Sequence, residues 1–153
     1  MKYWFAATIG CLSSLFALPP EDHQAIHRII VDYTNSWNRS TGKGFSKDFS
    51  VDADFVNIYG MHFKGKQEIE DRHIEILSTL FKESQLEILQ TNLREVNPDL
   101  VIANVYWKLD GYRDPRSGKD AITQTKKGIF IQVFVRAEKK WEITASQNTL
   151  VGR

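Results

Sequence analysis

The chain has little of what many functional sites require. Its one cysteine among 153 residues is Cys11, which lies in an apolar N-terminal segment. Without that segment the chain has no cysteine, which excludes disulfide frameworks, cysteine nucleophiles and thiolate metal sites. The formal net charge is +1 and no block of like charges occurs. The composition therefore does not indicate a protein that binds nucleic acid or a membrane surface.

Familiar catalytic and cofactor motifs are missing too. The sequence has no Gly-rich phosphate loop, nucleophile elbow, HExxH motif or dinucleotide fingerprint. His23 and His27 are four residues apart on a predicted helix, but no third ligand accompanies them. We therefore predict no metal site and no organic cofactor. Residues 38–40 match a glycosylation sequon, a short pattern that also arises by chance.

Residues 1–17 have the pattern of a targeting segment. Lys2 supplies a positive charge, residues 3–16 are apolar or small, and Ala17 ends the run. This pattern predicts a secretory signal peptide cleaved after Ala17, and hence a periplasmic or secreted protein with no stable membrane insertion after cleavage. The apolar run is short for a spanning helix. A lipid anchor on Cys11 and a retained N-terminal segment are the disfavoured alternatives.

Residues 18–153 fit one domain that begins with helices. In residues 21–38 the apolar side chains recur at spacings of four, three and four, which predicts a helix with one apolar stripe. Residues 66–82 predict a second long helix with His73 on its apolar face. Phe45 and Phe49 suggest a short helical turn between them. A strand is expected at residues 55–59, followed by a turn or tight hairpin at 60–65.

The second half of the chain reads as four strands. They are expected at residues 85–96, 100–112, 121–137 and 140–151. Long consecutive strands joined mostly by short turns imply an antiparallel, strongly curved sheet. Helices that precede such strands predict an α+β fold, with the helices on one face of the sheet.

The segment from Trp37 to His73 resembles a known family. It contains Trp37-Asn38, a polar gap, the run at residues 52–60 that ends in glycine, Gly65, and a helical run that ends at His73. The order resembles the SnoaL-like branch of the nuclear-transport-factor-2-like (NTF2-like) superfamily, most closely its SgcJ/EcaC-type members. The resemblance implies a cone of two long helices and a short one on a curved, mostly antiparallel sheet, with a pocket at its open end.

Two titratable residues are candidate acid–base groups. His73 can donate or accept a proton near neutral pH; it is either a core histidine or a functional residue of the pocket. Asp54 opens the predicted strand where the resemblance places the pocket. It could act as a base if desolvation raised its pKa, or it could join Asp52 in binding backbone amides at a turn.

The first strand and the first helix supply candidate ligand-binding residues. Phe55, Asn57 and Tyr59 alternate, so they are expected on one face of the strand. That face is either the cavity or the outside, because five residues do not fix the register. Trp37 ends the first helix on its apolar face, either in the core or at the edge of the pocket.

Two further candidates lie on the later strands. Tyr106 alternates with apolar neighbours and could donate a hydrogen bond. Gln132 interrupts an apolar run, and it either lines the pocket, joins a polar interface or faces outward, because an unpaired buried amide is costly. Aromatic and amide side chains on both sets of alternating positions exceed what one helical layer can cover, so we predict a homodimer joined through the sheet.

Two functions are consistent with these features. The favoured one is a secreted, dimeric module that binds a small apolar or amphipathic organic ligand in its cone, or a partner through its sheet, because no clear acid–base pair is present. The alternative is an enzyme without metal or cofactor: an isomerase, cyclase, dehydratase or hydrolase. Its base would be His73 or Asp54, with Asn57, Tyr59 or Tyr106 donating hydrogen bonds to a developing oxyanion.

Overall fold

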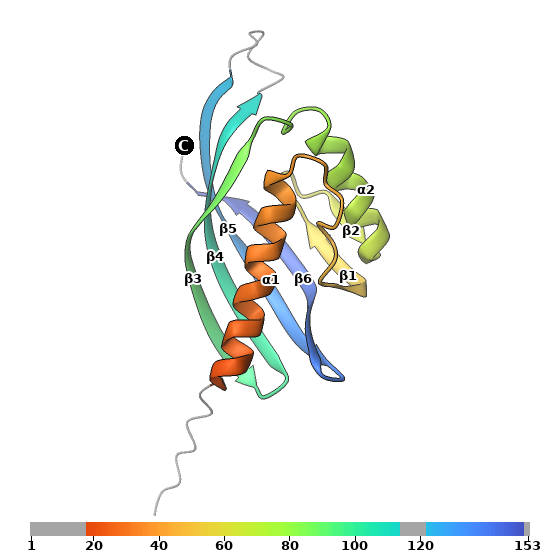
Figure 1. Ribbon diagram of the computed structural model, residues 1–153, viewed down its shortest axis with the longest axis vertical. Helices are drawn as coiled ribbons and strands as arrows, with labels where there is room; N and C mark the ends of the chain where they lie inside the picture. The colour runs from red at the N-terminus through yellow and green to blue at the C-terminus, as the bar shows by residue number, and fades with distance from the viewer. Residues whose placement is uncertain (1–17, 114–121, 152–153) are drawn as a thin grey trace, which may run out of the picture.

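The computed structural model describes residues 18–113 and 122–151. The predicted signal peptide, Cys11 and most of the loop between the middle strands lie outside these residues. Figure 1 shows the elements, which in chain order are α1 (Pro20–Asn38), β1 (Phe49–Val56), β2 (His62–Lys64), α2 (Gly65–Leu77), β3 (Gln85–Asn97), β4 (Leu100–Arg113), β5 (Ile122–Ala137) and β6 (Lys140–Leu150).

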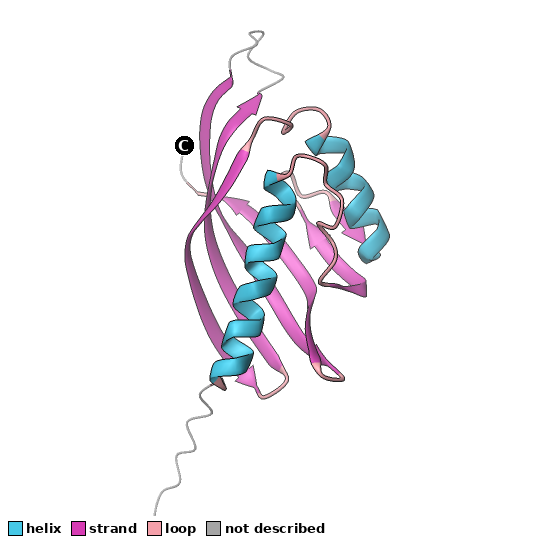
Figure 2. Ribbon diagram, viewed as in Figure 1, coloured by secondary structure: helices cyan, strands magenta, loops and turns pink. Residues whose placement is uncertain are grey.

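The sheet has six strands in the order β2-β1-β6-β5-β4-β3. All neighbouring strands are antiparallel except β1 and β6, which are parallel. Both helices lie on the same side of the curved sheet, with α1 along its middle and α2 against β1 and β2 (Figure 2). In the part of the chain that the structure describes, no helix covers the other face. The predicted α+β architecture is confirmed.

Some predicted boundaries in the first half of the chain are wrong. Residues 45–49 do not form a helix: they make consecutive turns in which Phe45 N–H donates to Gly42 C=O and Phe49 N–H to Ser46 C=O. The first strand runs from Phe49 to Val56 rather than over residues 55–59. At residues 60–65 the structure has the hairpin alternative, in which the short strand β2 pairs antiparallel with β1. Helix α2 ends at Leu77 rather than at residue 82, because tighter turns follow it.

Buried side chains fix α1 along its whole length. The predicted stripe of Ile26, Ile30, Tyr33 and Trp37 is buried. At the start of the helix, the Asp22 carboxylate accepts hydrogen bonds from Arg136 and from the Trp141 indole. The hydrogen bonds from Arg136 outweigh burial and hold the pKa of Asp22 below its ordinary value.

The end of α1 is joined to the start of β3. The Asn38 amide nitrogen donates to Leu86 C=O at 2.9 Å, and the Asn38 amide oxygen accepts the Leu86 N–H at 2.7 Å. The neighbouring Trp37 indole donates to Ser84 Oγ at 3.0 Å. The side-chain nitrogen of Asn38, the atom that glycosylation of the sequon would modify, is thus hydrogen-bonded in the folded chain. The same contacts set the distance between α1 and the sheet. Within residues 18–113 and 122–151, neither helix is long and apolar enough to cross a membrane.

Candidate ligand-binding cavity

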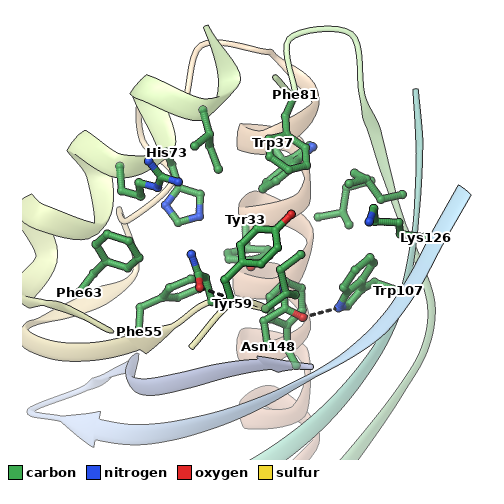
Figure 3. A pocket seen from close by; sticks show the side chains of 17 residues that line it. Tyr33, Trp37, Phe55, Tyr59, Phe63, His73, Phe81, Trp107, Lys126 and Asn148 are labelled. Atoms are coloured by element: carbon green, nitrogen blue, oxygen red, sulfur yellow. Dashed lines mark hydrogen bonds between the residues drawn. The ribbon is translucent and has the colours of Figure 1, made fainter. Parts of the chain in front are cut away.

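A cavity lies between the two helices and the sheet (Figure 3). The volume that the centre of a water-sized sphere can occupy is about 70 Å³, and all the space between the lining atoms, open mouth included, is about 670 Å³. Eight aromatic side chains form most of its wall: Tyr33, Trp37, Phe55, Tyr59, Phe63, Phe81, Trp107 and Phe130. Four aliphatic side chains fill the gaps: Ile58, Ile76, Leu86 and Leu109. Five lining residues have polar or charged groups: Asn57, Arg72, His73, Lys126 and Asn148.

His73 is buried in the wall contributed by α2, with 3% of its surface exposed. Its Nδ1 is 2.7 Å from the carbonyl oxygen of Ile69 in the same helix. A carbonyl only accepts, so Nδ1 carries the proton and Nε2 is the acceptor of the neutral ring. Nε2 is therefore the ring atom that can accept a hydrogen bond from a ligand in the cavity that His73 lines.

The environment of His73 keeps its ring uncharged. Burial is the main cause that lowers the pKa of His73 to about 3, with a further contribution from Arg72, whereas the bond to Ile69 and the charge of Glu70 act in the opposite direction. The imidazole lies against Phe45 and meets the edge of Phe55. At neutral pH the side chain is therefore a hydrogen-bond acceptor with no positive charge.

The loop before β1 is fastened to α2 next to His73. Glu70 accepts hydrogen bonds from Gly44 N–H at 2.6 Å, from Ser46 N–H at 2.9 Å and from Ser46 Oγ at 2.7 Å. Burial raises the pKa of Glu70, but these hydrogen bonds outweigh it and the net pKa is lowered. Gly42 has φ +68°, and an added Cβ would lie 2.4 Å from Ile74 N. Only glycine allows this approach, which brings Phe45 onto His73.

The opposite wall is built around Trp107. The indole lies directly over Gly128, where an added Cβ would be 2.1 Å from an indole carbon. The indole N–H donates to Asn148 Oδ1 at 3.0 Å. Because Gly128 has no side chain, the indole can lie flat across two strands and leave space in front of it. Asn148 retains its amide nitrogen as a donor.

The mouth is edged by a turn that carries Tyr59. Asn57 Oδ1 accepts the N–H groups of Tyr59 and Met61 at 2.9 and 3.0 Å, and Gly60 has φ +77°. The Tyr59 side chain is 56% exposed and extends across the front of the cavity (Figure 3).

Deeper inside, burial raises the pKa of Tyr33 well above its ordinary value, and its hydroxyl has no partner among residues 18–113 and 122–151.

Five of the residues expected from the sequence to be at the site line this cavity: Trp37, Phe55, Asn57, Tyr59 and His73. The other three lie elsewhere. Asp54 faces away from Phe55 and pairs with His62 Nε2 at 2.6 Å on the surface. Tyr106 points to the uncovered face of the sheet, because its neighbour Trp107 points inward. Gln132 is buried beside Ser146, away from the cavity lining.

Several residues that line the cavity were not predicted from the sequence. Trp107, Lys126, Phe130 and Asn148 come from three later strands whose alignment depends on long-range pairing. Arg72 precedes His73 on α2 and sits off its apolar stripe, yet its long side chain reaches the cavity. Alternation along each strand could have predicted the inward faces, but it gives no information on how far along the sheet the cavity extends.

Neither a metal site nor a catalytic dyad is present in the described part of the chain. No group of three or more His, Cys, Asp or Glu side chains lies close enough to hold a metal ion there. His23 and His27 contact each other on the surface of α1, with ring centroids 4.7 Å apart. No carboxylate lines the cavity within residues 18–113 and 122–151, so His73 has no acid partner in it.

Comparisons with known proteins define the fold. No protein-family model matches the chain, and no curated protein matches its sequence significantly. An uncharacterized protein with a cystatin-like fold from Caulobacter vibrioides is 28% identical, over 86% of this chain and 91% of its own, with a TM-score of 0.76. An NTF2-like superfamily protein from Salmonella enterica is 19% identical, over 85% and 91% of the two chains, with a TM-score of 0.70.

The same fold occurs in a protein from Novosphingobium aromaticivorans that is assigned as a scytalone dehydratase. It is 13% identical, over 86% of this chain and 85% of its own, with a TM-score of 0.73. At this identity the likeness concerns the fold alone. The chain therefore has the cystatin-like, NTF2-like fold, and its function must be argued from its own cavity.

Proposed function

We propose that the protein is a SnoaL-like, SgcJ/EcaC-type module that binds a small amphipathic organic molecule in its cavity. One observation carries the proposal. A cavity walled by aromatic side chains also contains His73, a neutral imidazole whose Nδ1 is bound to Ile69 C=O and whose Nε2 can accept a hydrogen bond. Ligand sites are mostly apolar cavities in which a few polar groups set the orientation. A flat apolar ligand with a hydrogen-bond donor would contact the aromatic walls and satisfy His73 Nε2.

Binding is favoured over catalysis by the state of His73. A general base works best when its pKa is near the working pH, and it needs a group that stabilises the charged ring. The pKa of His73 is lowered to about 3 by burial, and Nδ1 is engaged by Ile69 C=O rather than by a carboxylate. The ring is thus suited to accepting a hydrogen bond and poorly suited to taking up a proton.

Mass spectrometry of protein purified without denaturation tests the proposal. We expect a small organic compound to be released from the wild-type protein on denaturation. Ile76→Trp fills the cavity from α2 and should reduce the yield of this compound. Val31→Trp places the same side chain on α1 at a position that is 53% exposed, and should leave the yield unchanged. Equal yields from both variants would place the compound outside the cavity.

The second candidate function is a cofactor-independent enzyme, such as an isomerase, cyclase, dehydratase or hydrolase. It is supported by the acceptor nitrogen of His73 in a cavity lined mostly by apolar side chains, and by the dehydratase assignment of a protein with this fold. His73 would be the base, and Asn57 or Tyr59 could donate hydrogen bonds. Turnover of the co-purified compound that is lost in His73→Phe and kept in Asp54→Asn would favour the enzyme.

The proposal includes a homodimer outside the cytoplasm. The uncovered face of the sheet exposes Ile131 at 49% of its surface. Ile102, Ile129 and Val133 lie on the same face, with Tyr106 beside them. An apolar surface of this kind is suited to a second copy of the chain.

Intact-mass analysis of protein from the native host tests cleavage after Ala17, since retention of residues 1–17 would contradict secretion by this signal.

A further inference from the structure

The two charged side chains that line the cavity in the described part of the chain are both cationic. Arg72 reaches it from α2 and Lys126 from β5, and no Asp or Glu side chain lines it within the described residues. His73 adds no charge. In Figure 3, His73 of α2 and Lys126 of β5 lie on opposite sides of the cavity, and Arg72 belongs to the same helix as His73. A site that carries fixed charge of one sign favours ligands of the other sign.

Arg72 is only partly paired. Its Nη1 donates to Glu75 at 2.7 Å, and the Glu75 side chain is 66% exposed. Exposed ion pairs of this kind contribute little. Arg72 Nε is buried and has no acceptor among the residues described, and the guanidinium lies over the ring of Phe63. An unpaired buried donor is costly, so an acceptor that enters beside it is favoured.

Among the described residues, Lys126 also has no acidic partner. Its ammonium group lies 4.6 Å from the centre of the Tyr112 ring, and no carboxylate of residues 18–113 or 122–151 forms an ion pair with it. An ammonium over an aromatic face is held in position while its charge stays available. Asn148, on the same side, has its amide oxygen engaged by Trp107, so it too offers donors rather than acceptors.

Building on the proposed function, we infer that the cavity selects a ring compound with one anionic group, such as an aryl carboxylate. The ring fits the aromatic walls. The anion accepts hydrogen bonds from Arg72 or Lys126, and charge-assisted bonds of this type are stronger than neutral ones. Arg72 is suited to a carboxylate because its guanidinium is planar and presents several donors. A cationic ligand would find no counter-charge in the described wall.

Calorimetric titration with three probes on the same ring system tests this inference: naphthoate, naphthamide and naphthylmethylamine. They differ mainly in charge. We expect naphthoate to bind at least about ten-fold more tightly than naphthamide, and the amine to bind most weakly. The wild type is compared with Arg72→Gln, Lys126→Gln and the matched control Lys127→Gln. Lys127 is the next residue along β5 and is exposed. A thermal melt of each variant confirms that it is folded.

The outcomes separate the inference from the proposed function. A preference for naphthoate that shrinks in Arg72→Gln or Lys126→Gln, and persists in Lys127→Gln, supports the inference. Equal binding of the three probes, or a preference unchanged in both variants, overturns the anion selectivity and leaves a binding cavity. If no probe binds, the inference is overturned; if no compound co-purifies with the wild type either, the proposed function is overturned with it.

Discussion

The imidazole of His73 lies flat against the ring of Phe45, with ring centroids 3.4 Å apart and planes 13° from parallel. Phe45 belongs to the loop before β1, so this contact joins the loop to α2. Trp37 approaches the same imidazole at its edge. His73 is thus both a packing residue and a cavity residue. His73→Phe separates the two roles, because phenylalanine keeps an aromatic ring at this position but has no ring nitrogen.

His73→Phe should reduce ligand affinity and make the protein less sensitive to acid. The ordinary pKa of 6.5 applies to the unfolded chain, whereas the folded pKa is about 3. The unfolded chain therefore binds the proton first, and wild-type stability falls as the pH is lowered from about 6.5 toward 3. From pH 7.5 to pH 5, urea titration should show a loss of free energy of unfolding that is about 2 kcal/mol larger in the wild type than in the variant. Equal losses would contradict the burial of a neutral imidazole.

Gly128→Ala should damage the cavity wall more than a single methyl group normally does. The added Cβ would lie 2.1 Å from the Trp107 ring and 2.5 Å from Thr149 O. The indole must move, which breaks its hydrogen bond to Asn148. We expect a destabilisation of about 1–3 kcal/mol from overpacking and a change in tryptophan fluorescence. A crystal structure of the variant that shows Trp107 in place would refute this reading.

Glu70→Gln should loosen the loop that carries Phe45. The amide oxygen can replace one carboxylate acceptor, but the second oxygen and the negative charge are lost. We expect a loss of about 1–3 kcal/mol in stability and faster hydrogen exchange at the amides of Gly44 and Ser46. The matched control is Asp71→Asn on the same helix, since Asp71 is exposed and accepts a hydrogen bond from Gln67. Similar exchange rates in both variants would show that Glu70 does not fasten the loop.

Ile131→Glu should convert the proposed dimer to a monomer. Ile131 is half exposed at the centre of the uncovered sheet face, and a charge buried there without a partner opposes association. Sedimentation at micromolar concentration should show the wild type as a dimer and the variant as a folded monomer. Val51→Glu, on a side chain that is 84% exposed on β1, should leave the assembly intact. A wild type that sediments only as a monomer would end the dimer proposal.

The sequence predicted the elements whose signal is local. Helical spacing predicts the apolar stripe from Ile26 to Trp37. Long runs rich in β-branched and aromatic residues, separated by turn residues, predict the later strands. The sequence places the first strand too late along the chain because Asn57 and Tyr59 fit alternating strand positions, whereas β1 ends at Val56. In the structure the Asn57 side chain instead closes a turn around Gly60, a choice that depends on side-chain hydrogen bonds.

The site was only half predictable for a related reason. His73 could be placed because one helical stripe determines which way it points. Asp54 could not, because the register of β1 against β2 and β6 decides which face it takes. Lys126 and Trp107 meet the cavity only through the pairing of β4 with β5. Arg72 enters through the reach of its long side chain, which periodicity does not describe.

The position of β6 between β1 and β5 has a consequence for how the molecule assembles. β1 and β2 join the rest of the sheet only through the parallel contact with β6, the last strand of the chain. Until β6 is synthesised, the β1–β2 pair and α2 have no sheet to join, and His73 has no opposite wall. The cavity is therefore a product of late, long-range closure, a step that is slow compared with local helix formation. Until then the aromatic residues of the two halves lack part of their cover, and exposed apolar surface of this kind favours aggregation.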